Sequence, residues 1–449
     1  GHTPTGGMPA VGTATTGVLL DAFGTGDATW SLLETMNGTA GLRGRRGRLV
    51  GTTSAALGET LAMEPRPSVR TPELEQSNTV LFVGERAMLK IYRQIDPGIN
   101  AELEIGHFLS ERSEGRVAPR VWGAVQYEQR GQASSVVAIA QEFVPNEGDA
   151  WHLTTDAIEL FFERVLTEHP AGPPPLPPTR WTEAARTEIP GSMLELAGRY
   201  FSLARQLGKR TGEVHNLLGK GGTDPAFSRE PFSPQHQQSI YQWSHVRLAR
   251  LIENLTRRAG QLPIDARPLA NTLVQSEKAV DDLLKAVAGR RIDVDRIRTH
   301  GDLHLGQVLF TGDDFVIIDF EGEPARPANE RRYKRGALRD VMGMIRSFSY
   351  ATEAVLRGGR VRAEDRAALE PWATSWTQWV SAAYLNSYLQ TVAGQRLVPT
   401  DDAVTDLLLE FYELEKVIYE IDYEMSSRPD WVRIPMVGLL RILARRSQA

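Results

Sequence analysis

The chain has 449 residues, 41% of them hydrophobic, so it is long enough to bury a sizeable core and to form two or three lobes or domains. Its net charge of -5 is mild and its acidic and basic residues are interspersed, which gives no electrostatic basis for binding nucleic acid or an anionic membrane. The absence of cysteine excludes disulfides and thiolate metal sites, and no apolar run reaches the roughly 18 residues of a membrane-spanning helix.

The first 75 residues are rich in Gly, Thr and small apolar residues, with short alternating patches at 29–32 and 48–51. We predict a small β-rich cap for residues 1–75, and the composition does not indicate its role. The chain begins with Gly-His-Thr-Pro, without Met and without a basic-then-apolar signal pattern. We therefore expect a cleavage remnant at the start and a cytoplasmic protein.

Residues 76–145 have the pattern of a small sheet with one helix. A helix is expected from about residue 100 to residue 110, with Asn100 as its N-cap and an apolar stripe that includes Leu103 and Phe108. Alternating and apolar runs predict strands at 80–83, 87–92, 120–127 and 134–142.

Lys90 stands alone among apolar residues on its predicted strand. Burying an unpaired ammonium is costly, so a phosphate or carboxylate partner is expected for it. The alternative is a lysine on an edge strand whose ammonium reaches solvent.

From residue 146 onward the chain turns helical. The proline-rich stretch 173–178 is interpreted as a surface loop inside this larger lobe, because helical patterns lie on both sides of it. His215 is expected to be a packed or capping histidine. Apolar residues at helical spacing predict helices at 200–218, 239–255, 268–287 and about 405–425.

The segment His-Gly-Asp-Leu-His-Leu-Gly-Gln at 300–307 carries the strongest chemical signal. Asp302 in a tight loop can accept a proton from a substrate hydroxyl, and the amide of Gln307 can hold Mg²⁺. Two short strands joined by a turn at 311–314 would bring Gln307 close to Asp319, a second metal ligand. The simpler alternative is that the two aspartates only cap loops.

These segments resemble the protein-kinase-like phosphotransferases of the aminoglycoside and choline kinase type, and more closely the bacterial maltokinases. The likeness runs from about residue 76 to the C-terminus and depends on the order and number of its motifs. The segments that carry it are 76–79, 89–92, 300–307, 318–324, 338–348, 415–420, 428–431 and 434–435.

The resemblance implies an α+β, protein-kinase-like fold of two lobes, with the β-rich cap, an N-lobe at 76–145 and a mostly helical C-lobe at 146–449. It also implies that Lys90 clamps the phosphates of ATP and that an acidic residue of the next helix orients it. We choose Glu104 over Glu102 for this partner. The two residues lie on roughly opposite faces of the helix, so the helix phase decides between them.

A glycine-rich phosphate loop is absent ahead of Lys90, which departs from the protein kinases. Gln76, Ser77, Asn78 and Thr79 offer amide, hydroxyl and backbone donors in its place, although the same residues would also make a simple polar turn. The resemblance places adenine against the backbone of Glu142 and Val144.

The same resemblance assigns the cofactors ATP and Mg²⁺. It implies that Gln307 and Asp319 hold Mg²⁺ ions. Glu321 stands in the position where protein kinases have glycine and is expected to support the second metal ion.

Candidate acceptor-binding residues lie near the catalytic loop and on the predicted helix at 405–425. His304, Arg339 and Asp340 would line the near and far walls. Carboxylates and aromatic faces suit a sugar, although a solvated helix face would have the same composition. On the C-terminal helix the candidates are Tyr419, Glu420, Tyr423 and Glu424.

The resemblance implies an ATP-dependent kinase that phosphorylates the anomeric hydroxyl of maltose to maltose 1-phosphate. It places the protein in trehalose to α-glucan (glycogen) metabolism, with trehalose synthase as a fused or associated partner. A glucosamine or other aminosugar kinase of the same fold is the alternative. A nucleotide-binding scaffold is the second alternative, and the presence of Lys90, Asp302, Gln307 and Asp319 argues against it.

Overall fold

A computed structural model describes residues 12–14, 17–19, 26–38, 41–72, 78–168, 171–323 and 326–448, with the side chains of 26–446 outside the gaps. Gln76 and Ser77, two predicted phosphate-binding residues, lie outside the described residues. The chain divides into two compact units. The first contains residues 1–145 and 318–332, and the second contains residues 146–317 and 333–449.

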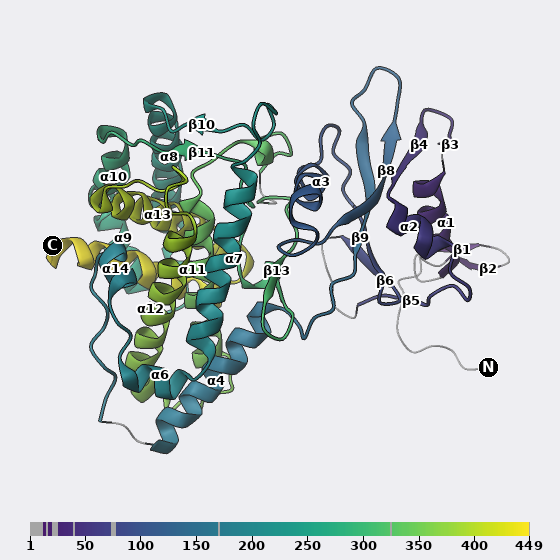
Figure 1. Cartoon of the computed structure of the whole chain (residues 1–449). Helices are drawn as coiled ribbons and strands as arrows, with labels where there is room; N and C mark the ends of the chain where they lie inside the picture. Colours follow the sequence, from purple (N-terminus) through teal and green to yellow (C-terminus); the bar gives the residue numbers. More distant parts are fainter. Residues whose placement is uncertain are drawn as a thin grey trace. The chain divides into compact units, whose positions relative to one another are not determined.

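The first unit is built on a seven-stranded antiparallel sheet with the order β3-β4-β8-β9-β7-β6-β5 (Figure 1). Four of its strands match the predicted ones, since β6 and β7 pair from Thr79↔Ile91 to Val83↔Ala87 and β8 pairs with β9. The sheet strands are β3 (Leu42–Arg43), β4 (Arg48–Thr53), β5 (Val69–Arg70), β6 (Thr79–Val83), β7 (Ala87–Ile91), β8 (Val121–Glu128) and β9 (Ser135–Glu142).

The predicted cap and the predicted lobe share this sheet and one core. Strand β4 pairs with β8 over six residues, so the expected boundary at residue 75 does not separate two units. Gly51 on β4 lies so close to α1 (Gly26–Asn37) that an added Cβ would come 2.1 Å from the carbonyl oxygen of Thr35. A glycine is therefore required where the helix meets the strand.

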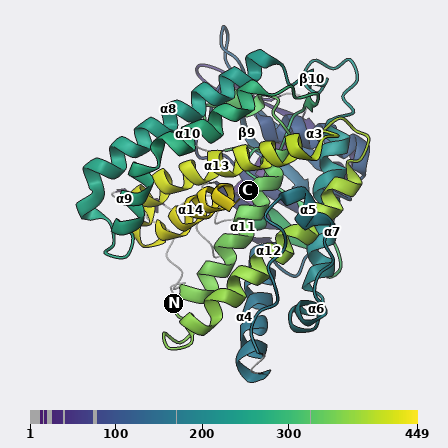
Figure 2. The same ribbon diagram turned by 90° about the vertical axis from the view of Figure 1, so that its left-hand side faces the viewer.

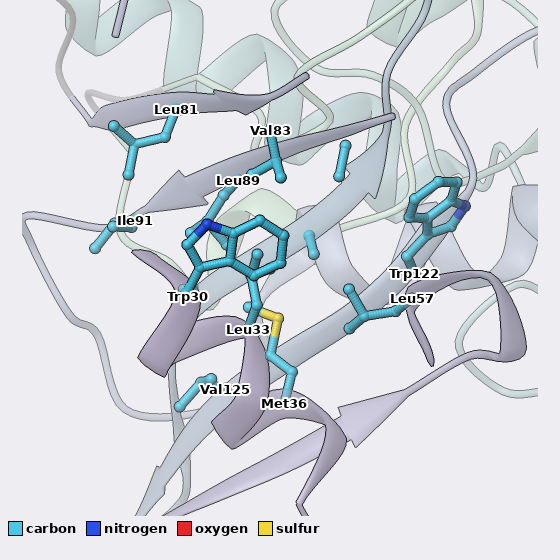
Figure 3. Packing of buried hydrophobic residues seen from close by; sticks show 13 residues of the cluster. Trp30, Leu33, Met36, Leu57, Leu81, Val83, Leu89, Ile91, Trp122 and Val125 are labelled. Carbon is cyan, nitrogen blue, oxygen red and sulfur yellow. The ribbon is translucent and has the colours of Figure 1, made fainter. Parts of the chain in front are cut away.

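Figure 3 shows the core beneath the sheet, where Trp30, Leu33 and Met36 of α1 pack with Leu57 of α2 (Ala55–Leu61). The alternating patch at 29–32 is thus helical and not a strand, because its apolar residues continue at a spacing of three. The pair β1 (Gly12–Ala14) and β2 (Gly17–Leu19) precedes this helix.

The helix of the predicted lobe, α3, spans Ala101–Ser113. The Asn100 side chain accepts a hydrogen bond from the Leu103 N–H at 2.9 Å, which confirms the predicted N-cap. This cap fixes the phase of the helix and so decides which of its acidic residues faces the sheet.

The second unit is mostly helical, and its α11 packs against both α12 and α13 (Figure 2). Its helices are α4 (Ala150–Glu168), α5 (Trp181–Arg186), α6 (Gly191–Ala197), α7 (Tyr200–Leu218), α8 (Pro234–Arg258), α9 (Arg267–Gln275), α10 (Glu277–Ala286), α11 (Leu338–Arg357), α12 (Arg366–Thr391), α13 (Asp402–Ser427) and α14 (Arg433–Gln448). Its short strands are β10 (Glu230–Pro231), β11 (Asp295–Arg296), β12 (Val308–Phe310) and β13 (Phe315–Ile317).

The predicted helices are present, but the one expected at 268–287 is two helices, α9 and α10, that meet at Ser276. Within the described part of the chain, no helix has both the length and the apolar character needed to cross a membrane.

The predicted hairpin is confirmed, with Val308 opposite Ile317 and Gly312 in the turn at φ +99°. Asp314 in this turn accepts hydrogen bonds from Arg210 Nε at 2.7 Å and from Gln206 Nε2 at 2.8 Å. Burial alone would raise the pKa of Asp314, but these bonds from α7 hold the pKa at about 2. The hairpin is therefore anchored to α7 by a carboxylate that is stable in its charged form.

We predict that Asp314→Asn lowers the free energy of unfolding at pH 7, because Arg210 loses its charged partner. The loss should be only about 1 kcal/mol, since Asp314 is partly exposed and solvent screens the pair. The folded-state pKa is depressed, so the contribution is fully present above about pH 4 and is lost as the pH falls toward 2. Urea unfolding at pH 7 and pH 3 should show a smaller difference between wild type and variant at pH 3. Asp313→Asn, a change at the exposed neighbour, serves as the control.

Candidate active site

Lys90 lies on β7 with only 6% of its surface exposed. Its ammonium donates to Glu102 Oε2 at 2.8 Å and to Asp319 Oδ1 at 2.5 Å, and it forms a third ion pair with Glu321. Burial alone would lower the pKa of Lys90, but the three carboxylates raise it well above its usual value. Lys90 is therefore a permanent buried cation.

Glu102, not Glu104, is the helix partner of Lys90, so our choice between the two was wrong. Glu102 is 1% exposed and also accepts a hydrogen bond from the Tyr92 hydroxyl at 2.6 Å. Glu104 instead pairs with Arg332 at 2.7 Å. The two glutamates are about 200° apart around the helix, and the cap at Asn100 turns Glu102 toward the sheet.

Three carboxylates gather around Lys90, and oxygens of Glu102, Asp319 and Glu321 all lie within 4.8 Å of one another. Burial, together with Asp319 and Glu102, raises the pKa of Glu321 to about 7 against the opposing effect of Lys90. Close-packed carboxylate oxygens are the donors that Mg²⁺ uses, and a divalent cation would relieve their repulsion. The donor set therefore fits the predicted metal ligands Asp319 and Glu321.

Asp319 is held in a left-handed backbone conformation, at φ +66°. A non-glycine residue adopts this conformation at some cost in energy, and such residues concentrate at functional sites. The backbone here places the carboxylate against Lys90.

The predicted phosphate-binding residues that the structure describes have other partners. Asn78 donates from Nδ2 to Glu321 Oε1 at 2.9 Å, and the Thr79 hydroxyl accepts from Arg93 Nε at 3.2 Å. Their role in phosphate binding stays a prediction.

The segment at 142–144, which is predicted to contact adenine, is held by hydrogen bonds at its first two residues. The Glu142 N–H donates to the Arg120 carbonyl at 2.8 Å, and the Glu142 carboxylate is held by the Arg120 guanidinium at 2.6 Å. The Phe143 N–H donates to the Arg86 carbonyl at 2.9 Å. A nucleotide would therefore have to use other backbone groups of this segment, and the contact with Glu142 and Val144 stays a prediction.

In the second unit, the loop that carries Asp302 is held by a buried carboxylate. Asp340 accepts the backbone N–H groups of His300 at 2.7 Å and Gly301 at 2.9 Å, and His215 Nε2 lies 3.2 Å from the same carboxylate. Burial alone would raise the pKa of Asp340, but His215, His300 and the loop N–H of Gly301 lower it.

We predicted that Asp340 lines the acceptor site, and this is wrong, because its side chain is only 2% exposed. Asp340 is instead a positioning residue for the loop. Arg339 also supports the loop, since it donates to the Gly301 carbonyl at 2.8 Å and lies 3.4 Å from Glu415. His215 is packed as expected, with its Nδ1 3.0 Å from the Tyr388 hydroxyl.

His304 precedes a short 3-10 turn at Leu305–Gln307, and Gln307 is the last residue of that turn. The His304 Nδ1 accepts the Gly306 N–H at 3.1 Å, so this ring caps the turn. Gln307 belongs to the second unit, whereas Asp319 and Glu321 belong to the first. The shared metal site that we predicted for them stays a prediction.

Lys416 on α13 is a partner of Asp302 that the sequence did not suggest. Its Nζ lies 3.4 Å from Asp302 Oδ1, and both side chains are about a quarter exposed. The candidate base thus has a cation beside it, and both groups remain accessible to a small molecule.

Two of the acidic residues predicted to bind the acceptor are used inside the helical unit. Glu420 pairs with Arg346 of α11 at 2.8 Å, and both are buried. Glu424, 1% exposed, pairs with Arg428 at 2.7 Å. Glu420 thus joins α13 to α11, whereas Glu424 pairs with the C-cap of its own helix. A buried carboxylate that has a partner is not offered to a ligand.

The aromatic candidates on α13 remain at the surface. Tyr419 and Tyr423 stack with their ring centroids 6.1 Å apart, and Tyr423 is 45% exposed. Helix α8 adds two residues beside them: Arg247 lies 5.0 Å from the Tyr419 ring and 4.5 Å from the Trp243 ring. The spacing of Trp243 and Arg247 marks one helix face, but only the packing of α8 on α13 brings that face to Tyr419.

Comparison with known proteins gives one family and several relatives. The pattern of the family described as the phosphotransferase enzyme family matches residues 68–322, more than half of the chain. A glucosamine kinase of Streptacidiphilus jiangxiensis is 24% identical over 377 residues, 83% of this chain and 73% of that protein. A glucosamine kinase of Mycolicibacterium smegmatis is 24% identical over 378 residues, 82% of this chain and 78% of that protein.

Solved structures with similar folds include two of glucosamine kinase. One, in crystal form B, has a TM-score of 0.63 and 19% identity, and the match covers 96% of this chain and 88% of that one. The other, in complex with glucosamine, ADP and inorganic phosphate, has a TM-score of 0.62 and 20% identity, with 97% and 87% covered. These likenesses confirm the predicted fold class, a β-sheet N-terminal region with a largely helical C-terminal part.

We predict that Glu102→Gln weakens binding of MgATP about tenfold, because Lys90 loses the charged partner that orients it. Glu104→Gln, a matched change two residues along the same helix, should leave the affinity within about twofold. Calorimetric titration with MgATP measures both, and melting temperatures separate lost binding from lost folding. Equal losses in the two variants would contradict the assignment of Glu102.

Proposed function

The chain belongs to the phosphotransferase enzyme family, and we propose that it is an ATP-dependent kinase that transfers the γ-phosphoryl group to a hydroxyl of a sugar. The observation that carries the proposal is the presence of two charged groups in fixed positions. One is the buried Lys90, held by carboxylates, and the other is the accessible Asp302, on a loop that Asp340 holds in place. A kinase needs both, one for the phosphates and one for the acceptor hydroxyl.

In the proposed mechanism, Asp319 and Glu321, with Gln307 as a further predicted ligand, would hold Mg²⁺, and the ion would supply positive charge to neutralise the phosphates. Lys90 donates to phosphate oxygens, and Glu102 keeps its ammonium in place. Asp302 accepts the proton of the acceptor hydroxyl as its oxygen attacks phosphorus. Asp340 holds the loop so that Asp302 keeps its position.

Glucosamine or another aminosugar is the acceptor that the relatives support. Two curated relatives that match more than four fifths of this chain are named glucosamine kinases, and so are the similar structures. The more specific resemblance to maltokinases has no such support. The acidic residues of α13 that we predicted to bind the acceptor, Glu420 and Glu424, are already paired with arginines.

A neutral sugar such as maltose remains a second candidate, because Lys416 lies beside Asp302. An acceptor ammonium close to this lysine would be repelled, whereas a hydroxyl would not. The predicted place in trehalose and glycogen metabolism and the predicted association with trehalose synthase depend on maltose as the acceptor, and they stay predictions.

Release of ADP from MgATP tests the proposal with glucosamine, maltose, glucose, an aminoglycoside and choline as acceptors. We expect turnover on a sugar and a loss of about 100-fold or more in kcat for Asp302→Asn, because the variant cannot accept the proton. The preferred sugar identifies the acceptor. Turnover on choline or the aminoglycoside alone, or no turnover on any of the five, would contradict a sugar kinase.

The contribution of Lys416 is tested with Lys416→Met. We expect the ratio of kcat/KM for glucosamine to that for glucose to rise about tenfold, since the variant removes a positive charge next to the bound amine. Lys285→Met, at an exposed position on α10, is the control and should leave the ratio unchanged. A parallel fall for both sugars would show that Lys416 only supports Asp302.

A further inference from the structure

A pocket of about 300 Å³ lies within the second unit, away from the residues described above. It is lined by residues next to or on α5, near the end of α10, on the first turns of α13 and on the last turns of α14. None of its lining residues belongs to the loop of Asp302 or to the α13 turns that carry Lys416 and Tyr419. Its volume is at the lower end of the range for small-molecule sites.

The lining of this pocket is rich in arginine. Arg180, Arg290, Arg445 and Arg446 contribute four guanidinium groups, whereas only two carboxylates, Asp406 and Glu410, face the same space. The pocket is therefore positively charged, although the chain as a whole is negative.

The two carboxylates already have partners. Asp406 accepts from Arg180 Nε at 3.0 Å and also from the Thr182 N–H at 2.8 Å and hydroxyl at 3.0 Å. Glu410 pairs with Arg446 at 2.5 Å. A guanidinium has five N–H donors and a carboxylate uses one or two of them, so each arginine can bind an additional anion without losing its partner.

Arg290 differs from the other three arginines. Its side chain is exposed, and in the part of the chain that the structure describes no carboxylate forms an ion pair with it. Among the described residues it is the positive charge of the pocket that no acidic side chain pairs with.

The lining of the pocket also includes aromatic and aliphatic side chains. The Arg445 guanidinium lies 5.2 Å from the Trp181 ring and also pairs with Glu413, which fixes its orientation. Ala286, Ala403 and Leu407 add aliphatic groups. The pocket thus offers guanidinium groups together with an indole ring and aliphatic surface.

We propose that this pocket binds a small phosphate monoester, with its phosphate at Arg290 and Arg446 and its organic part against Trp181. A phosphate has three terminal oxygens and a charge near -2, so it can bind several guanidinium groups at once, which a carboxylate does less well. The site is separate from the proposed transfer of phosphate, and it stands or falls independently of that function.

Calorimetric titration of the full chain with glucose 6-phosphate, AMP and inorganic phosphate tests the proposal, with glucose as the uncharged control. MgADP is kept at saturation so that the nucleotide site is filled. Arg290→Ala is compared with Arg291→Ala, which removes the same charge from an exposed neighbour that does not line the pocket. We expect a monoester to bind about tenfold more weakly to Arg290→Ala and with unchanged affinity to Arg291→Ala.

The affinity should also fall with added salt, because exposed charges are screened. Trp181→Ala should weaken the monoesters more than inorganic phosphate. No binding of any of the three phosphates, or equal affinities in the two arginine variants, would overturn the proposal. If inorganic phosphate binds as tightly as both esters, the proposed contact between the organic part of the ligand and Trp181 is overturned.

Discussion

The ion-paired cluster around Lys90 determines how the first unit is assembled. A buried ammonium is tolerated only with charged partners, and here they come from α3 and from a segment more than 200 residues later in the chain. Two further contacts join the later segment to the sheet and to α3: Asn78 donates to Glu321, and Arg332 pairs with Glu104. This explains why residues 318–332 belong to the sheet unit and not to the helical lobe that the sequence assigned them to.

The same requirement explains the arrangement of the helical unit. Asp340, Glu420 and Glu424 are buried, so each needs hydrogen bonds or a cation, and each has them. Asp340 holds the loop of Asp302, and Glu420 joins helix α13 to α11. The groups that remain accessible for the proposed recognition of an acceptor are Asp302, Lys416 and the stacked pair Tyr419 and Tyr423.

Local features were predictable from the sequence because short-range chemistry fixes them: the cap at Asn100, the hairpin at 308–317 and the packed His215. The choice of Glu104 failed because it depends on a helix phase that spacing alone does not give. The acidic residues on α13 were predicted to bind a ligand, but Glu420 pairs with Arg346 of α11 and Glu424 pairs with Arg428, one turn later in the chain. Trp243 and Arg247 acquire meaning only when α8 packs on α13.

Under the proposed function, the choice of acceptor depends on the charges of one pair of residues, Asp302 and Lys416. A sugar hydroxyl can hydrogen-bond to Asp302 while Lys416 stays at 3.4 Å. An aminosugar brings a second ammonium into the same space, so it must either keep its amine away from Lys416 or displace the lysine from Asp302. At 24% identity, the names of the relatives support the type of reaction more strongly than the identity of the acceptor. A single charged group in a site can reverse the preference between two acceptors. Under the proposed function, phosphate binding therefore depends on Lys90 and its carboxylates, whereas the choice of acceptor depends on Asp302 and Lys416.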